Sequence, residues 1–418
     1  MNQADVIVVG AGPAGSASAI HLAHAGLSVL LLDKAQFPRE KVCGDGLTPR
    51  AVKELSSLGI DVQALEWKRN RGLRIHVGST HYLMAWPELT GFPNFGMAIQ
   101  RSVFDQYLVD VACKSGVEFV SQANVDSPIR RKDRIAGVIT RDGRRFEATV
   151  VVAADGNSAR LPIAMGLHRD QSRPLGVAVR TYFNSPLSDA DWLDSWLELW
   201  EGPPRRSRLL PGYGWSFPIG DGACNVGLGL PDANRYRHVN LRQMMSNWLA
   251  TMPVEWGLTE PNRLTPIVSA ALPMGFNRQP LYTRGLLLVG DSAGMINAFN
   301  GEGISYAMES ARYAADKIAQ AHTRGFHTRS ADQILRAYPD LLTKQWSGYF
   351  RLGNLFTKII AHPTVMKTAS HYGLPIPFVR NLTHRMLAHL WDQPPKTLYD
   401  HLCHLLTHLG CSDRLQTG

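Results

Sequence analysis

The sequence contains few cysteines and no pattern that would pair them. Its 418 residues include five, odd in number and scattered along the chain: Cys43, Cys113, Cys224, Cys403 and Cys411. This usage argues against a disulfide framework and favours a reducing, cytoplasmic setting.

Long apolar runs are also missing. No stretch approaches the ~20 residues that a helix needs to cross a bilayer, and there are no internal repeats or low-complexity tracts. The first apolar strand begins within a few residues of Met1, so we expect no secretory signal or transit peptide. Hydrophobic residues make up 44% of the chain, which can therefore bury a sizeable core, and we expect two or more domains.

Acidic residues are in the minority. There are 35 Asp and Glu against 44 Lys and Arg, which gives a formal net charge of +9. An excess of positive charge suits an anionic partner. No nucleic-acid-binding motif is present, so we expect no nucleic-acid partner and favour an anionic lipid or membrane surface.

A glycine loop near the start of the chain predicts dinucleotide binding. The apolar strand Asp5–Val9 leads into the run Gly10-Ala11-Gly12-Pro13-Ala14-Gly15 and then into a helix. The three glycines allow a tight turn, a close approach of backbone N–H groups to a pyrophosphate, and close packing of helix on strand. Asp33 ends the second strand 18 positions after Gly15, where a carboxylate can accept hydrogen bonds from ribose hydroxyls.

Two later segments indicate that this dinucleotide is a flavin. Asp155 and Gly156 follow the apolar strand Thr149–Ala154, and ligands bind at the carboxyl ends of such strands. The run Gly290–Ile304 then places Asp291 before a helix that begins near Gly303. Free N–H groups at a helix N-terminus stabilise the negative charge of a reduced flavin.

The predicted fold is α/β with three parts. Residues 1–65, 97–165 and 276–328 form a discontinuous Rossmann-like FAD-binding domain. Residues 66–96 and 166–275 alternate apolar and polar positions, which predicts an inserted antiparallel sheet over the redox face of the cofactor. Residues 329–418 are expected to be helical. Within the first part, we expect a strand over Glu118–Val125 and a solvated basic turn over Arg130–Arg134.

The three motifs in chain order resemble the aromatic-hydroxylase-like superfamily of FAD enzymes. Two further segments, Phe37–Arg50 with Cys43-Gly44-Asp45-Gly46, and Pro211–Pro218 followed by Asn225–Gly229, resemble signatures of the geranylgeranyl reductase family. These flavoproteins saturate isoprenoid double bonds. Over residues 4–320 the pattern looks most like the actinobacterial menaquinone reductases, which reduce one isoprene unit of the quinone tail. Many relatives carry a glycine where Asp45 stands.

The resemblance implies a set of cofactor contacts. The pyrophosphate would lie on the glycine loop with Arg101 near it, although an exposed arginine at a helix start is the alternative reading. Asp291 would bind the ribityl hydroxyls, and the N–H groups of Gly303 and Ile304 would face the pyrimidine carbonyl. The full expected set is Gly10, Gly12, Pro13, Ala14, Gly15, Asp33, Lys34, Cys43, Gly44, Gly46, Arg101, Val125, Asp155, Asp291, Gly303 and Ile304.

The implied reaction transfers hydride from reduced flavin to an alkene and also needs a proton, an oriented substrate and a water-poor site. We expect Cys43 and Asp45 to deliver the proton, with a small buried hydrophobe as the alternative role for Cys43. Tyr213, Trp215 and Phe217 alternate along one strand and therefore share a face. They would line a tunnel for a polyprenyl chain, although plain core packing gives the same pattern. No second glycine fingerprint is present, so NAD(P)H or another donor would dock only transiently.

The C-terminal segment leaves two interpretations open. His401, His404 and His408 recur at helical spacing, but they lack the paired spacing of a zinc site, so we expect no metal. The residues Leu402, Leu405, Leu406 and Leu409, with Lys358, Lys367, Arg380 and Arg385, suit a peripheral contact with the inner face of the cytoplasmic membrane. An ordinary packed helical cap is the alternative.

Competing functions come from three classes. A geranylgeranyl diphosphate or geranylgeranyl-lipid reductase would share every flavin motif. An aromatic hydroxylase or halogenase would use the same fold with oxygen. A prenyl-binding carrier would keep the nucleotide fold without flavin chemistry.

Overall fold

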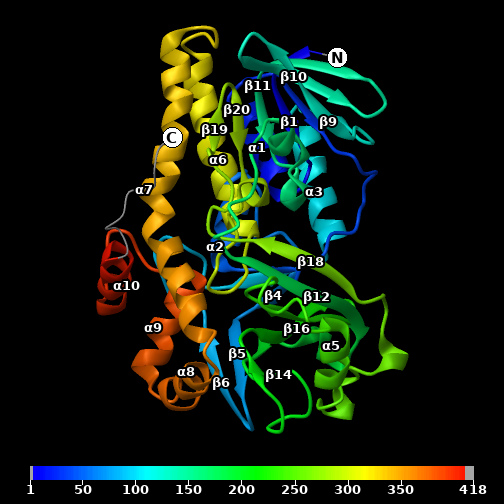
Figure 1. Ribbon diagram of the computed structural model, residues 1–418, viewed down its shortest axis with the longest axis vertical. Helices are drawn as coiled ribbons and strands as arrows, with labels where there is room; N and C mark the ends of the chain where they lie inside the picture. The colour runs from blue at the N-terminus through cyan, green and yellow to red at the C-terminus, as the bar shows by residue number, and fades with distance from the viewer. Residues whose placement is uncertain (1–2, 410–418) are drawn as a thin grey trace.

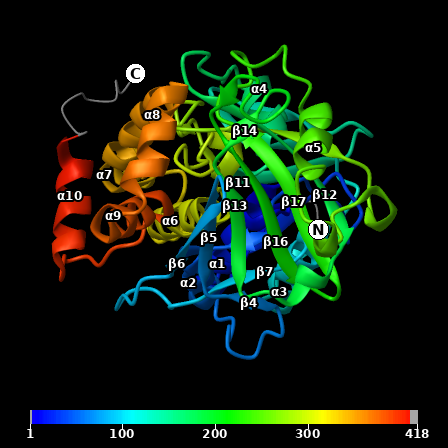
Figure 2. The same ribbon diagram turned by 90° about the horizontal axis from the view of Figure 1, so that it is seen from below.

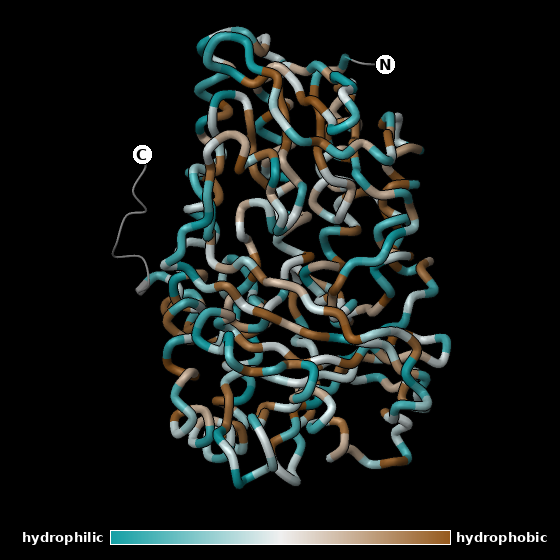
Figure 3. The backbone as a smooth tube through the Cα atoms, turned by 45° about the vertical axis from the view of Figure 1, so that its right-hand side comes forward, coloured by the Kyte–Doolittle hydropathy of each residue, from teal (hydrophilic) through white to brown (hydrophobic). Residues whose placement is uncertain are grey.

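The computed structural model describes residues 3–409. Two sheets lie one above the other, and the long helix α7 (Arg329–Ile360) runs along one side of both (Figure 1). The hydropathy-coloured tube in Figure 3 shows hydrophobic segments following the strands through the interior, with mostly hydrophilic loops at the top of the view. No helix in this part of the chain is long and apolar enough to cross a membrane.

The first sheet has a parallel core in the order β8-β2-β1-β11-β20. β2 is buried throughout, and β1 and β11 are apolar and buried toward their carboxyl ends, because α1 (Pro13–His24), α3 (Arg101–Lys114) and α6 (Ile304–His322) are packed around the sheet. The strands of this sheet are β1 (Gln3–Val9), β2 (Val29–Leu32), β8 (Glu118–Val120), β9 (Val125–Arg131), β10 (Arg134–Thr140), β11 (Arg145–Ala153), β19 (Tyr282–Thr283) and β20 (Leu286–Leu288).

The region after residue 118 differs from the expected single strand. β8 ends at Val120, and β9 begins separately at Val125 after a turn. The break is explained by pairing, because β8 extends the parallel core beside β2 whereas β9 forms a hairpin with β10. The tip of this hairpin carries the basic run, which is exposed from Arg130 to Asp133 as expected, while Arg134 is half-buried and pairs with Asp332.

The second sheet has the order β18-β12-β17-β16-β13-β5-β6. It is antiparallel except for the pair β13–β5, whose strands come from distant segments and are not joined by a hairpin. Its strands are β5 (Gly72–Val77), β6 (Thr80–Ala85), β12 (Leu175–Asn184), β13 (Trp192–Trp196), β16 (Tyr213–Gly220), β17 (Ala223–Leu230) and β18 (Val268–Pro273). The domain boundaries given above stay a prediction.

Two small sheets and several short helices complete this part of the fold. β3 pairs with β7 and β7 with β4, directly after the Cys43–Gly46 loop. The remaining elements are β3 (Gly46–Leu47), β4 (Lys68–Asn70), β7 (Gly96–Ala98), β14 (Leu199–Trp200), β15 (Leu209–Leu210), α2 (Pro49–Ser57), α4 (Arg160–Ala164) and α5 (Leu241–Leu249).

The chain after α6 is helical, as expected for the described residues. Seen from below, its helices gather on the side of the molecule opposite α5 (Figure 2). After α7 they are α8 (Pro363–Thr368), a π-helical turn over Ala369–Gly373, α9 (Pro377–Ala388) and α10 (Leu398–Leu409).

Candidate functional site

The glycine loop has the geometry that a dinucleotide requires. A Cβ on Gly10 would lie 2.3 Å from the Ala154 carbonyl oxygen, and one on Gly15 would lie 1.7 Å from the Gly10 carbonyl oxygen. Gly12 differs, because a Cβ there would meet nothing closer than 3.5 Å. Gly12 is also the residue before α1, whose free N–H groups face the same space. The structure therefore leaves room for a phosphate where the sequence predicted one.

Two guanidinium groups flank this space. The atoms nearest to a Cβ on Gly12 belong to Arg39, at 3.5 Å, and Arg101, at 3.8 Å. Asp105 holds both side chains, with two hydrogen bonds of 2.8 Å from Arg101 and an ion pair of 3.1 Å with Arg39. Burial alone would lower the pKa of Arg101, but Asp105 raises it, so the guanidinium stays charged.

Arg101 is 7% exposed, so the alternative of a solvent-exposed arginine is wrong. Arg39 was not expected in the site, although it belongs to the quoted Phe37–Arg50 segment. A second arginine at the phosphate turn is typical of anion binding, but no spacing along the chain ties Arg39 to Gly12.

The residues expected at the adenosine end lie where β2 stops. Asp33 accepts hydrogen bonds from the N–H groups of Ala11 and Ala35, each at 2.8 Å. Its carbonyl accepts one from Ala123 at 2.7 Å, which places the segment that enters β9 at Val125 beside it. Lys34 follows Asp33 and is exposed. These residues share one edge of the sheet, and their contacts with a cofactor stay a prediction.

The two later acidic residues have different surroundings. Asp155 is engaged by the chain itself, accepting from the Ser292 hydroxyl at 2.8 Å and the Leu161 N–H at 3.0 Å. It therefore ties the end of β11 to the turn Gly290–Ala293. Burial raises the pKa of Asp291, which Lys41 and Arg101 oppose. A Cβ on Gly303 would lie 3.3 Å from Asp291 Oδ1, so this carboxylate lies beside the N-terminus of α6.

Asp45 lies at the centre of a buried hydrogen-bond network. Its φ of 63° is in the left-handed region, which favours glycine, and its side chain is completely buried. Oδ2 accepts from the Tyr182 hydroxyl at 2.6 Å and from Asn225 Nδ2 at 2.7 Å, and Oδ1 accepts from the Arg101 N–H at 3.3 Å. Burial raises the pKa of Asp45 to about 6, while Tyr182 and Asn225 oppose the rise.

Cys43 lies in the same loop, where its carbonyl and its thiol sulfur both accept hydrogen bonds. Asn225 Nδ2 donates to the Cys43 carbonyl at 2.7 Å, and the Asp45 N–H donates to Sγ at 3.4 Å. Burial raises the pKa of the Cys43 thiol, which Arg101 opposes. The thiol is therefore protonated at neutral pH.

The aromatic stripe on β16 faces this loop. A Cβ on Gly44 would lie 3.5 Å from the Phe217 ring and 3.7 Å from Trp215 Nε1. The ring centroids of Tyr213 and Trp215 are 5.8 Å apart, and those of Trp215 and Phe217 are 6.1 Å apart. Trp215 Nε1 donates to Asn225 Oδ1 at 2.9 Å. The shared face expected from the alternation is confirmed.

Tyr182 and Asn225 were not among the expected site residues. Asn225 belongs to a quoted motif, and Tyr182 lies in an alternating strand, but they are 137 and 180 residues from Asp45. Only the pairing of β12 with β17 and of β17 with β16 brings them together with the loop.

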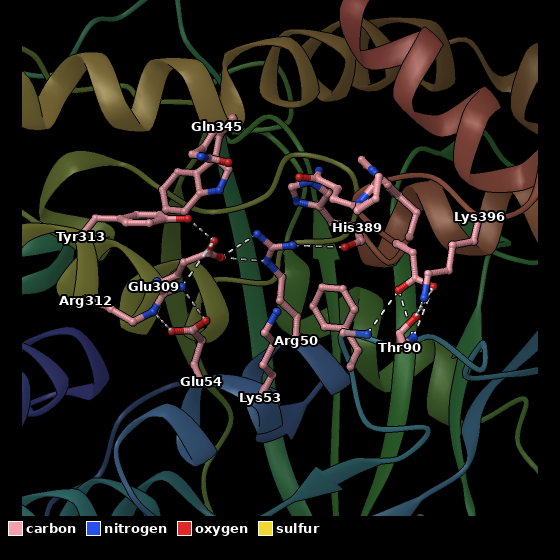
Figure 4. A pocket seen from close by; sticks show the side chains of 17 residues that line it. Arg50, Lys53, Glu54, Thr90, Glu309, Arg312, Tyr313, Gln345, His389 and Lys396 are labelled. Carbon is pink, nitrogen blue, oxygen red and sulfur yellow. Dashed lines mark hydrogen bonds and ion pairs between the residues drawn. The ribbon is translucent and has the colours of Figure 1, made fainter. Parts of the chain in front are cut away.

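A cavity of about 330 Å³ opens between α2, α6, α7 and residues 389–396 (Figure 4). Its carboxylates are already engaged: Glu309 pairs with Arg50 at 2.6 Å, and Glu54 pairs with Arg312 at 3.0 Å. None of the expected site residues lines it. We therefore place the candidate site at the glycine loop and the Cys43–Gly46 loop.

The histidines of α10 do not gather metal ligands. His404 Nε2 and His408 Nε2 are 3.1 Å apart, and residues 3–409 contain no group of three or more His, Cys, Asp or Glu that could hold a metal. Cys411 lies outside the described residues.

Comparisons with known proteins agree with this geometry. The FAD binding domain family matches residues 3–338. The menaquinone reductase of Mycobacterium tuberculosis is 34% identical over 391 residues, which is 93% of this chain and 92% of the relative. The digeranylgeranylglycerophospholipid reductase 1 of Methanococcoides burtonii is 27% identical over 84% of this chain and 81% of its own length.

Solved structures share the fold. A geranylgeranyl bacteriochlorophyll reductase-like protein from Thermoplasma acidophilum has a TM-score of 0.75 at 22% identity, covering 96% of both chains. A flavin-dependent brominase has a TM-score of 0.69 at 20% identity, covering 97% of this chain and 98% of its own. Because one fold carries both reductases and halogenases, the fold alone does not choose the reaction.

Proposed function

Because the chain belongs to the FAD-binding family that contains the menaquinone reductases, we propose that it saturates one isoprene unit of a menaquinone tail. The chain is an FAD-dependent oxidoreductase. The observation that supports the substrate is the aromatic stripe of β16, which lies against the Cys43–Gly46 loop and offers apolar area to a hydrocarbon chain.

The residues present fit FAD. Gly12 leaves open space for a pyrophosphate between Arg39 and Arg101, and the N-termini of α1 and α6 each supply free N–H groups. In this proposal Asp33 and Lys34 hold the adenosine ribose, and Val125 lies by the adenine. Asp291 binds the ribityl chain. Asp155 acts by tying β11 to the turn that carries Asp291.

Reduced FAD supplies a hydride to one carbon of the alkene, and the protein must supply a proton to the other. Cys43 carries a protonated thiol at neutral pH, because burial raises its pKa. Asp45, two residues away with a pKa of about 6, exchanges a proton near neutrality. We assign proton delivery to this pair. The rings of Tyr213, Trp215 and Phe217 exclude water and orient the tail.

The substrate resides in a bilayer, so we also propose peripheral contact with the inner face of the cytoplasmic membrane. The electron donor is NAD(P)H or another reductant that docks transiently.

A mass measurement tests the reaction. Enzyme photoreduced without oxygen should convert menaquinone to a product that stays about two mass units heavier after the quinone ring is reoxidised, because a saturated tail bond keeps its two added hydrogens whereas a quinol loses them. Geranylgeranyl diphosphate and a geranylgeranyl lipid serve as competing substrates in the same assay. Preferential reduction of either competitor would identify that compound, rather than menaquinone, as the substrate. Oxygen-dependent hydroxylation or halogenation would overturn the reductase assignment.

The proton donor is tested by Cys43→Ser, with Cys113→Ser as the control because Cys113 is exposed on α3. We expect kcat to fall by about a hundredfold or more for Cys43→Ser, in the range typical of losing a general acid, and to stay unchanged for the control. An unchanged kcat for Cys43→Ser would remove the thiol from proton transfer and leave the role to Asp45.

The tunnel is tested by Trp215→Ala, with Trp248→Ala as the control. Trp248 packs on Gly214, on the opposite face of β16, where a Cβ on Gly214 would lie 2.6 Å from its ring. Trp215→Ala should raise KM for long-tailed substrates more than for short ones, because the lost apolar contact matters only where the tail extends. An equal effect on both would indicate core packing instead.

A further inference from the structure

The C-terminal helices carry an unusual share of exposed apolar side chains. Eight of the fourteen large apolar side chains that are exposed in residues 3–409 lie between positions 355 and 398. They are Leu355, Ile359, Val365, Tyr372, Ile376, Phe378, Val379 and Leu398. We call this set the cap patch. Exposed apolar residues gathered in this way mark an interaction surface.

The members of the cap patch are neighbours in the fold. Leu355 and Ile359 are one turn apart on α7. Val379 lies 3.6 Å from where a Cβ on Gly373 would be, directly beside Tyr372. Phe378 stacks on Tyr399, with ring centroids 5.2 Å apart, which brings Leu398 to the start of α9. Figure 1 and Figure 2 both show α8, α9 and α10 on the side of the molecule away from α5.

The charge on this surface has one sign. Residues 355–380 contain no Asp or Glu, whereas Lys358 and Lys367 are both exposed. Glu198 contacts the segment but is already engaged by His371 at 2.9 Å. Further along, Asp400 is completely buried and bonded to Arg385. A surface whose unpaired charges are cationic, beside exposed apolar side chains, is complementary to an anionic lipid headgroup layer and repels a basic partner such as another copy of this chain.

Apolar packing connects the cap patch to the aromatic stripe. Phe217 and Leu73 both pack on the cluster Trp86, Leu193, Ala388 and Leu390, which includes the end of α9. Leu73 also packs on the cluster that contains Leu374, in the turn between Tyr372 and Ile376. Apolar packing therefore extends from the candidate site to the buried residues that lie under the cap patch.

We propose that the cap patch is the surface that docks on an anionic bilayer, with Ile376 and Phe378 inserted among the lipids and Lys358 and Lys367 against the headgroups. This places the entry of a polyprenyl tail at α9, beside Leu374 and Leu390. The inference rests on the proposed function for the identity of the tail, whereas docking itself does not depend on catalysis.

Vesicle binding tests the surface. Holoenzyme is mixed with vesicles of phosphatidylglycerol and phosphatidylcholine, or of phosphatidylcholine alone, and the bound fraction is measured by sedimentation. We expect binding to the anionic vesicles and a loss of at least about tenfold for the double variant Ile376→Glu and Phe378→Glu, because each apolar side chain contributes more than the free energy of a tenfold change.

The control is Val254→Glu with Leu264→Glu. Val254 and Leu264 are 78% and 56% exposed and belong to the segment after α5 on the far side of the molecule. Replacing both with Glu adds the same charge as the Ile376→Glu and Phe378→Glu variant. The control should bind as the parent does, and retained flavin absorbance should show that both variants are folded. Equal losses in both double variants, or no binding by the parent, would overturn the proposal. The proposal would also be overturned if the parent forms a dimer and the Ile376→Glu and Phe378→Glu variant does not.

A failure of the proposed reaction can be distinguished from a failure of membrane docking. A protein that binds anionic vesicles through α9 but does not reduce menaquinone would contradict the proposed function and leave the docking surface intact. A protein that reduces menaquinone but does not bind anionic vesicles through α9 would contradict the docking surface and leave the proposed function intact.

Discussion

Among single residues, Asp45 combines a left-handed backbone conformation with a buried side chain that accepts several hydrogen bonds. A glycine would give the loop the same left-handed turn but could accept nothing from Tyr182, Asn225 or the Arg101 N–H. The carboxylate therefore joins the cofactor loop to the second sheet. Because it is completely buried, the charged form is costly, and this cost appears as pH dependence.

We expect Asp45 to make the fold less stable as pH rises. Burial raises its pKa to about 6 from 3.8, so the folded protein binds this proton more tightly than the unfolded chain. The stability that it contributes is present below the unfolded pKa and is lost as pH rises through the folded pKa. The free energy of unfolding should thus fall by roughly 2 kcal/mol between pH 4 and pH 7 on this account.

Denaturant unfolding of wild-type and Asp45→Asn holoprotein over that pH range measures the effect. The difference between the two curves isolates Asp45 from other carboxyl groups. If the difference does not change with pH, Asp45 does not titrate between the two values.

Asn225 is a positioning residue, because it bonds to the Cys43 carbonyl, to Asp45 and to the Trp215 indole at once. Asn225→Leu leaves all three groups without that partner in a buried site. We expect a loss of about 2–4 kcal/mol in the free energy of unfolding, a lower kcat and a higher KM for long tails. Asn247→Leu, on the exposed face of α5, should change none of these. A loss of stability with both kinetic constants intact would restrict Asn225 to a structural role.

At the scale of elements, the unit of β1 and α1 shows which glycines serve the fold and which serve the ligand. Gly15 meets the Gly10 carbonyl oxygen, so any side chain there separates helix from strand. Gly12 has no such neighbour, and its φ of −81° is open to any residue. Within one motif, Gly15 is therefore required for the packing of helix on strand, whereas Gly12 is required for the space that the ligand occupies.

This difference predicts opposite results for two alanine substitutions. Gly12→Ala should fold as the parent does but bind FAD about tenfold more weakly or worse, because the methyl group occupies the space of a phosphate. Gly15→Ala should lower the melting temperature of the apoprotein. Thermal unfolding of apoprotein and flavin titration separate the two. A destabilised Gly12→Ala apoprotein, or a stable Gly15→Ala one, would contradict this assignment.

At the scale of the whole molecule, the net charge of +9 is partly concentrated by the fold on the helices after α6. Surface charge attraction is screened by salt, with a Debye length of about 10 Å at 0.1 M and about 3 Å at 1 M. Apolar insertion is not weakened in this way. A bilayer contact built from both should therefore respond only partly to salt.

We expect binding to anionic vesicles to weaken several-fold between 0.1 M and 1 M NaCl without being abolished. Lys358→Gln with Lys367→Gln should reduce this salt dependence. Arg131→Gln with Lys132→Gln, at the exposed tip of the β9–β10 hairpin, should not. Sedimentation with vesicles measures each case, and salt-independent binding by the parent would show that the lysines do not face the lipid.

Features whose physics is local could be predicted from the amino-acid residues alone. Turn glycines, the acid after β2, the buried strand before Asp155 and the helix entry at Gly303 are specified by near neighbours, so their spacing predicted the α/β fold and the cofactor. The alternation of Tyr213, Trp215 and Phe217 likewise fixed a shared face. The strand expected over Glu118–Val125 was wrong because pairing partners, rather than propensity, ended β8 at Val120.

Contacts between distant residues depend on how the folded elements pack. Asp45 acquires Tyr182 and Asn225 through the order of strands in the second sheet, and Arg39 reaches Gly12 through Asp105. The cap patch is visible only after folding, because many leucines and aromatics of the same helices are buried and the sequence does not show which ones remain exposed. Burial and long-range contact depend on the packing of whole elements, which residue spacing along the chain does not encode.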